Sequence, residues 1–183
     1  EKISYVQVEP LGEDEDAVDV IVGNLDGSKE HHQCKIGNIS DNFWSIATLQ
    51  SKELLTKGFQ HILSGSKSYK VVSRIGFRLL EDICQSALNS TGSSTDFYEH
   101  QIKGISQDRI KLFNELCKKL SLDQSKPDDL DKALQFLKCF EIRQFNEDDT
   151  DHEICRLFAE KLVYAPSFHL IHFLQTYPVK CNR

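Results

Sequence analysis

The residues best suited to chemistry are two histidines and a cysteine near residue 30. His31, His32 and Cys34 lie within four positions of one another, so they could supply a thiol nucleophile with its base, or metal ligands. On a β-strand, His32 and Cys34 would share a face. No Cys-x-x-Cys pair completes a zinc site, and a cysteine nucleophile also needs a lowered thiol pKa. An enzyme or metal site here is therefore the third of three functional hypotheses.

Other motifs that hold metals, nucleotides or cofactors are weak or missing. His169 and His172 lie three positions apart in an apolar segment, without the His-Glu-x-x-His pattern of zinc proteases. The run Ser64-Gly65-Ser66-Lys67 resembles a phosphate-binding loop, but a helical pattern precedes it where such a loop follows a strand. The sequence predicts no catalytic residue, no metal and no cofactor.

A row of cations forms the best candidate binding surface. It belongs to the helix predicted after Tyr69, opposite the apolar stripe that runs from Val72 to Ala87. Such a basic ridge could hold an acidic protein segment or a phosphate backbone, or it could simply be a solvated helix face. The ridge consists of Lys67, Lys70, Arg74 and Arg78.

Trp44 is the second candidate for partner binding. With Phe43 it lies in the link between the predicted strands and helices. Large aromatic side chains dominate protein cores, so a hydrophobic plug between the two layers is the preferred interpretation. Tryptophan is also enriched at interface hot spots, and an exposed anchor for a partner protein is the alternative.

The first forty residues read as β-structure. Strands are predicted at residues 3–9, 18–22 and 31–36, with Asp26-Gly27 supplying a hairpin turn. None of them has the two-sided apolar character of a parallel sheet, which favours an antiparallel arrangement.

From residue 51 onward the apolar period becomes helical. Ser106 is a predicted N-cap, Pro127 a predicted first-turn residue, and Thr150 opens a capping box. Helices are predicted at about residues 51–63, 71–87, 107–120, 127–140, 151–162 and 166–177.

These elements predict an α+β fold. A small N-terminal antiparallel β-sheet of about three strands should pack on a predominantly helical bundle of about six helices. Residues 1–183 are expected to form a single domain, with a β-region at 1–40 and a helical region at 51–178. We expect the chain to be a fragment of a larger protein.

Composition limits the compartment and the partners. The net charge of -6 disfavours attraction of the whole surface to nucleic acid, and no apolar run is long enough to cross a membrane. Cys84, Cys117 and Cys155 lie on or beside apolar helical faces, where buried thiols act as small hydrophobic groups. Reduced cysteines predict an intracellular protein, nuclear or cytoplasmic.

With little chemistry in view, the leading hypothesis is a non-catalytic protein–protein interaction or scaffold domain of an intracellular assembly. Its partner would be another protein, possibly one that presents an acidic segment to the basic ridge. The alternative is a nucleic-acid-associated domain that uses the ridge from Lys67 to Arg78.

Overall fold

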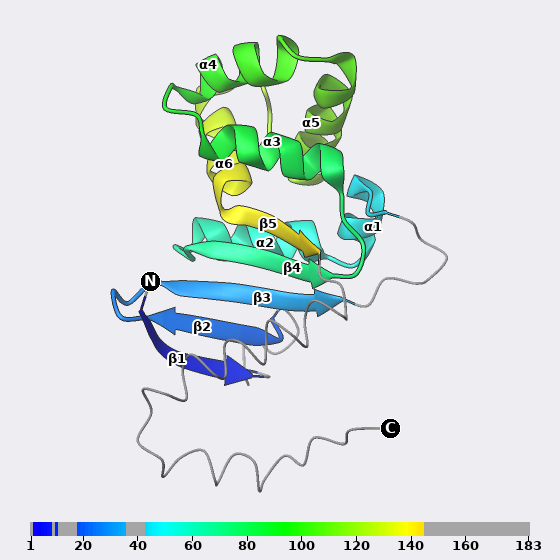
Figure 1. Ribbon diagram of the computed structural model, residues 1–183. Coiled ribbons are helices and arrows are strands. Elements are labelled where there is room, and N and C mark those ends of the chain that lie inside the picture. Colours follow the sequence, from blue (N-terminus) through cyan, green and yellow to red (C-terminus); the bar gives the residue numbers. More distant parts are fainter. Residues whose placement is uncertain (1, 9, 11–17, 36–42, 145–183) are drawn as a thin grey trace, which may run out of the picture. The chain divides into compact units, whose positions relative to one another are not determined.

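A mixed β-sheet organises the chain. The computed structural model describes residues 2–8, 10, 18–35 and 43–144, and within them the sheet has five strands in the order β1-β2-β3-β4-β5. Strand β2 pairs antiparallel with both β1 and β3, whereas β3, β4 and β5 run parallel to one another (Figure 1). The strands are β1 (Ile3–Val8), β2 (Val20–Asn24), β3 (Lys29–Lys35), β4 (Ser68–Ser73) and β5 (Phe140–Gln144).

Helices connect the parallel strands, as parallel pairing requires long crossover connections. Six α-helices and one π-helical segment, η1, lie within the described residues. They are α1 (Ile46–Ser51), α2 (Leu54–Leu63), α3 (Arg78–Leu88), α4 (Ser94–Phe97), η1 (Tyr98–Lys103), α5 (Gln107–Lys119) and α6 (Pro127–Cys139).

The α+β class is confirmed, but the predicted sheet of three antiparallel strands is wrong. The strands near residues 3–9, 18–22 and 31–36 exist and pair as expected, and two further strands extend the sheet in parallel. Most of β4 had been assigned to the helix predicted at 71–87, and β5 begins where the helix predicted at 127–140 was expected to end. In β4, burial alternates residue by residue, with Tyr69, Val71 and Ser73 buried, which is the period of a strand. The helix predicted from residue 71 begins only at Arg78.

The helix signals elsewhere agree with the structure. The Ser106 side chain caps α5 by accepting a hydrogen bond from the backbone N–H of Arg109. Pro127 is the first residue of α6, where its missing N–H costs nothing. The helices predicted at 151–162 and 166–177 lie outside the described residues, so the single domain over residues 1–183 stays a prediction.

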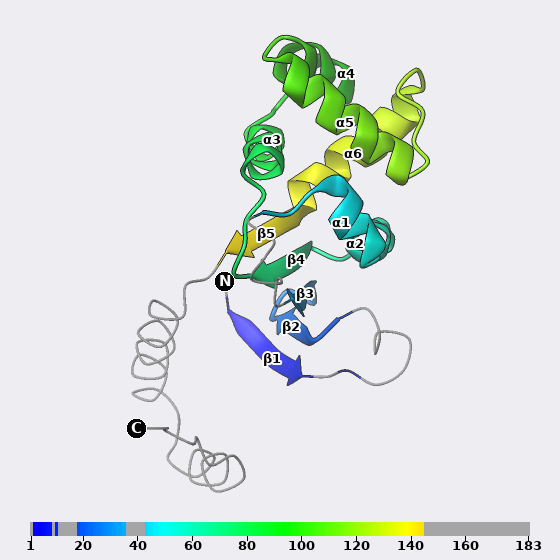
Figure 2. The same cartoon turned by 90° about the vertical axis from the view of Figure 1, so that its right-hand side faces the viewer.

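The core forms where α1 and α2 cover one face of the sheet. Figure 2 shows these two helices on one side of the sheet and α3 on the other. Gly58 of α2 lies against the rings of Tyr69 and Phe140, and an added Cβ would come within 2.9 Å of Tyr69. This close approach lets α2 pack directly onto β4 and β5. All of these elements belong to one compact unit that ends at Gln144.

The four cysteines in the described residues are free thiols. Cys84 and Cys117 are buried, as their positions on apolar helical faces predict. Burial raises the pKa of both thiols, so they stay protonated at neutral pH. Cys155 lies outside the described residues.

Candidate functional site

The predicted basic ridge does not exist as a single helical surface. Lys67 precedes β4, Lys70 lies within β4, Arg74 follows that strand and Arg78 opens α3. The ridge was predicted because the spacing of the four cations fits one face of a continuous helix. Residues 67–78 instead form a strand, a loop and the first residue of a helix, so the two lysines are separated from the two arginines.

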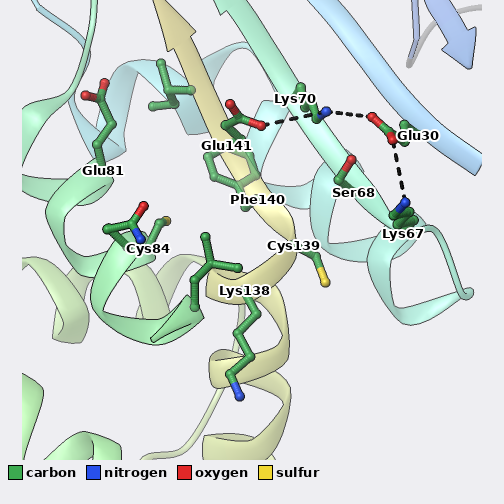
Figure 3. A pocket seen from close by; sticks show the side chains of 13 residues that line it. Glu30, Lys67, Ser68, Lys70, Glu81, Cys84, Lys138, Cys139, Phe140 and Glu141 are labelled. Carbon is green, nitrogen blue, oxygen red and sulfur yellow. Dashed lines mark hydrogen bonds and ion pairs between the residues drawn. The ribbon is translucent and has the colours of Figure 1, made fainter. Parts of the chain in front are cut away.

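Lys67 and Lys70 converge on one buried carboxylate, that of Glu30 in β3. The Lys70 Nζ lies 2.5 Å from Glu30 Oε2 and 3.8 Å from an oxygen of Glu141, while the Lys67 Nζ lies 4.0 Å from Glu30 Oε1 (Figure 3). Burial of Glu30 raises its pKa, but the hydrogen bond and charge of Lys70 outweigh burial and leave the pKa below its ordinary value. These lysines therefore form an internal ion-pair network, at the rim of a pocket of about 560 Å³.

His32 joins the same network. Its Nε2 lies 3.6 Å from Glu30 Oε2. Burial lowers the pKa of His32, the charges of Lys70 and Arg143 lower it further, and Glu30 opposes them. The folded protein consequently holds a neutral imidazole at a pH where the unfolded chain protonates it.

This difference predicts a loss of stability on mild acidification. Between about pH 7.5 and about pH 5.5 the unfolded state binds a proton at His32 that the folded state resists, so the free energy of unfolding falls as the pH falls. The variant His32→Gln should lose less stability over this interval than the wild type. Urea denaturation at both pH values measures the difference, and parallel losses would contradict the assignment.

The candidate group of His31, His32 and Cys34 does not converge. Alternation along β3 places His32 and Cys34 on one face and His31 on the other, where His31 stacks on His61 at 4.4 Å between ring centroids. Burial raises the pKa of the Cys34 thiol, and the nearby Asp19 carboxylate raises it further. A protonated thiol is a poor nucleophile.

Trp44 belongs to the core. Its side chain is 2% exposed, and its backbone N–H donates to the carbonyl of Gly76 in the loop after β4, at 3.0 Å. The exposed aromatic side chain at this position is Phe43, which is 68% exposed.

A different group of polar residues meets where the three parallel strands end. In Figure 1 the arrowheads of β3, β4 and β5 lie at the same side of the sheet, and β2 begins there. Open α/β sheets bind their ligands at this edge, because the crossover loops leave space outside the carboxyl ends of the strands. We call this group the carboxyl edge; it consists of Asp19, Gln33, Lys35, Ser73 and Gln144.

Asp19 is the best-defined member of the carboxyl edge. Its Oδ2 accepts a hydrogen bond from Gln33 Nε2 at 2.6 Å and another from the backbone N–H of Cys34 at 2.5 Å. The Gln33 side chain is 3% exposed, so a buried amide fixes the direction of the carboxylate. Among the described residues, the second oxygen, Oδ1, accepts no hydrogen bond.

Lys35 completes the arrangement. It lies two residues after Gln33, hence on the same face of β3, and its Cα pairs with that of Ser73 in β4. Asp19, Gln33 and Lys35 thus lie at one end of one face of the sheet.

The sequence held one overlooked signal for this site. Asp19 directly precedes β2 and has the same parity as the buried Ile21, so strand alternation points a charged side chain towards the core face. Charged residues are almost never placed there without a partner or a function. The link from Lys35 to Ser73 had no local signal, because a helical crossover of more than thirty residues separates them.

The carboxyl edge contains one carboxylate, that of Asp19. Within residues 2–8, 10, 18–35 and 43–144, no group of three or more His, Cys, Asp and Glu side chains could hold a metal ion alone. Mg²⁺ does not need such a cage, since it commonly takes one or two carboxylates and completes its shell with water and substrate phosphate oxygens. Asp19 Oδ1 fits this requirement. His169 and His172 lie outside the described residues.

Comparison of the chain with protein-family models, curated proteins and solved structures gives no match. No helix in the described part of the chain is long and apolar enough to cross a membrane.

Proposed function

We propose that the carboxyl edge is a Mg²⁺-dependent site for hydrolysis of phosphodiester bonds in nucleic acid. The observation that carries the proposal is the Asp19 carboxylate, fixed by Gln33 and the Cys34 N–H beside Lys35. It departs from the non-catalytic function that the sequence favoured, because no motif in the sequence marks Asp19, Gln33 and Lys35 as one group.

Each residue has a distinct role in this proposal. Asp19 would hold the cation, and Gln33 keeps the carboxylate pointed at the edge of the sheet. Lys35 would bind the phosphate and stabilise the negative charge that grows on its oxygens during hydrolysis. When bound, Mg²⁺ supplies further charge stabilisation and lowers the pKa of a coordinated water molecule.

The distribution of charge favours a phosphate substrate. The chain is acidic overall, with a net charge of -6. Near the carboxyl edge, however, Lys35 ends β3, and the exposed Arg74 and Arg78 follow the end of β4 along the chain. Cations that follow the ends of neighbouring strands in an acidic protein support recognition of an anion near that place.

Metal removal tests the activity directly. Purified protein incubated with a plasmid or a labelled linear duplex is expected to cut it in the presence of Mg²⁺ and to stop when EDTA is added in excess. Activity should return on adding Mg²⁺ beyond the chelator, because the cation is bound by few protein ligands and exchanges readily. Equal cleavage with and without EDTA, or no cleavage of duplex, single-stranded DNA or RNA, would contradict the proposal.

A protein–protein interaction remains the second candidate, and β1 supports it. This edge strand carries no charged residue and exposes Ile3, Tyr5, Val6 and Val8 by 43–66%. Exposed apolar edge strands are templates for an added strand from a partner. If β1 serves this purpose, Val6→Lys with Val8→Lys should abolish partner binding and leave nucleic-acid cleavage unchanged. An intracellular location is part of the same proposal, supported by the four free thiols.

A further inference from the structure

A second pocket lies at the end of the sheet opposite the carboxyl edge, where β3 and β4 begin. Its volume is about 340 Å³. Lys29 opens β3 and Lys35 ends it, so about 20 Å of strand separates this pocket from the carboxyl edge. The described residues that line the pocket are polar residues and glycines, namely Gly27, Ser28, Lys29, His31, His61, Ser64, Gly65 and Ser66. The pocket is therefore separate from the site to which we assigned hydrolysis.

Two loops with the same Gly-Ser-Lys sequence frame the pocket. Residues 27–29 lead into β3 and residues 65–67 lead into β4, and these two strands are parallel neighbours. The glycines of the two loops have φ angles of 83° and 99°, a backbone conformation that favours glycine. The Lys67 backbone N–H donates to the Lys29 carbonyl at 2.9 Å, so the two loops are held side by side.

The groups that would repel an anion in this pocket are engaged in hydrogen bonds. The carbonyls at the C-terminal end of α2 carry partial negative charge. Of these, the His61 carbonyl accepts from the Ser66 N–H at 3.0 Å and from the Ser64 hydroxyl at 2.9 Å. The Asp26 carboxylate, next to the first loop, accepts from the N–H and the hydroxyl of Ser28 at 2.9 and 2.6 Å. None of the described lining residues is an aspartate or a glutamate.

Each loop also contributes a donor. Lys29 is exposed at the start of β3, and Ser66 is half-buried in the second loop. Within the described part of the chain, neither side chain has a hydrogen bond or an ion pair. An ammonium group offers several N–H donors and a hydroxyl offers one. The only full positive charge among the described lining residues thus faces no carboxylate there, which favours a negatively charged ligand.

We propose that this pocket binds the phosphate group of a small ligand. The Lys29 ammonium pairs with the phosphate charge, as lysine does elsewhere, and the Ser66 hydroxyl donates to a phosphate oxygen. The volume falls in the range of small-ligand pockets, about 300–1,000 Å³, so it can hold more than the phosphate alone. The inference does not rest on hydrolysis at the carboxyl edge.

Inorganic phosphate is the probe that tests the pocket. Isotopically labelled full-length chain is titrated with phosphate at constant ionic strength, and the backbone amides of both loops should shift and saturate. Lys29→Gln should weaken binding by about 10-fold or more, the factor expected for a lost charge-assisted hydrogen bond. Ser66→Ala should weaken it by about 3-fold. The matched control is Lys118→Gln, which removes an exposed charge from α5 and should bind phosphate as the wild type does.

Two results would overturn the proposal. One is the absence of a saturable shift in the loops of the wild type. The other is an equal loss of affinity in Lys29→Gln and Lys118→Gln, because general charge would then explain the binding. Glycerol phosphate, titrated in the same way, separates an ester from the free ion: tighter binding assigns the pocket to a phosphate ester, and weaker binding assigns it to free phosphate.

The titration contains no nucleic acid, so its result is independent of the proposed activity. Saturable phosphate binding that Lys29→Gln weakens, without cleavage of nucleic acid by the wild type, keeps the pocket and overturns the hydrolytic function. Cleavage by the wild type without phosphate binding at the loops keeps the hydrolytic function and overturns the pocket.

Discussion

Substituting Asp19 by asparagine is expected to reduce Mg²⁺-dependent cleavage by about 100-fold or more. The substitution removes the negative charge that holds the cation, and losing a single electrostatic contact of this kind typically costs a factor of about 10²–10³ in rate. Asparagine keeps an oxygen that can accept from Gln33 and from the Cys34 N–H, so the shape of the edge is preserved. Initial rates of plasmid nicking, measured at saturating Mg²⁺, give the comparison.

Two substitutions on β3, one at the carboxyl edge and one as its control, extend this experiment. Lys35→Gln removes the ammonium group at the carboxyl edge, and Lys29→Gln removes an equivalent charge from the opposite end of the same strand, where Lys29 is exposed. We expect a large loss of rate for Lys35→Gln and an unchanged rate for Lys29→Gln. If Asp19→Asn and Lys35→Gln both cleave at the wild-type rate, the chemistry lies elsewhere or belongs to a contaminant.

The α+β class and most helix positions were accessible from the sequence because they depend on local patterns. The apolar period within α5 and α6, the Ser106 cap and the hairpin turn at Asp26-Gly27 are each encoded within a few neighbouring residues. The strand β4 was not accessible in the same way. Val71 and Val72 have the spacing of the apolar stripe of α3, so the pattern predicted that the helix begins there. The strand is defined by its pairing with β3 and β5, which the local sequence does not show.

The site was harder to predict than the fold because it is assembled by pairing across the sheet. Asp19 and Gln33 meet through a hairpin, but Ser73 and Gln144 arrive through parallel crossovers of many residues. Patterns within a few neighbouring residues do not show which strands pair. The sequence placed Lys67, Lys70, Arg74 and Arg78 on one helical ridge, whereas the buried Glu30 carboxylate engages the two lysines from the neighbouring strand.

Phe136→Ala is expected to lower the free energy of unfolding by about 3–5 kcal/mol, the usual cost of emptying a buried phenylalanine site. The Phe136 side chain in α6 is fully buried, and its ring centroid lies 4.7 Å from that of Phe140 and 5.9 Å from that of Phe59. It therefore joins α6, α2 and β5, and its removal leaves a cavity among aromatic rings that cannot all move inward. Urea denaturation followed by far-UV circular dichroism measures the change.

The matched control for this substitution is Phe43→Ala. Phe43 has the same side chain but is 68% exposed, so its removal should change the free energy of unfolding by less than about 0.5 kcal/mol. Similar losses for the two variants would mean that α6 does not pack against β5 and α2 as described.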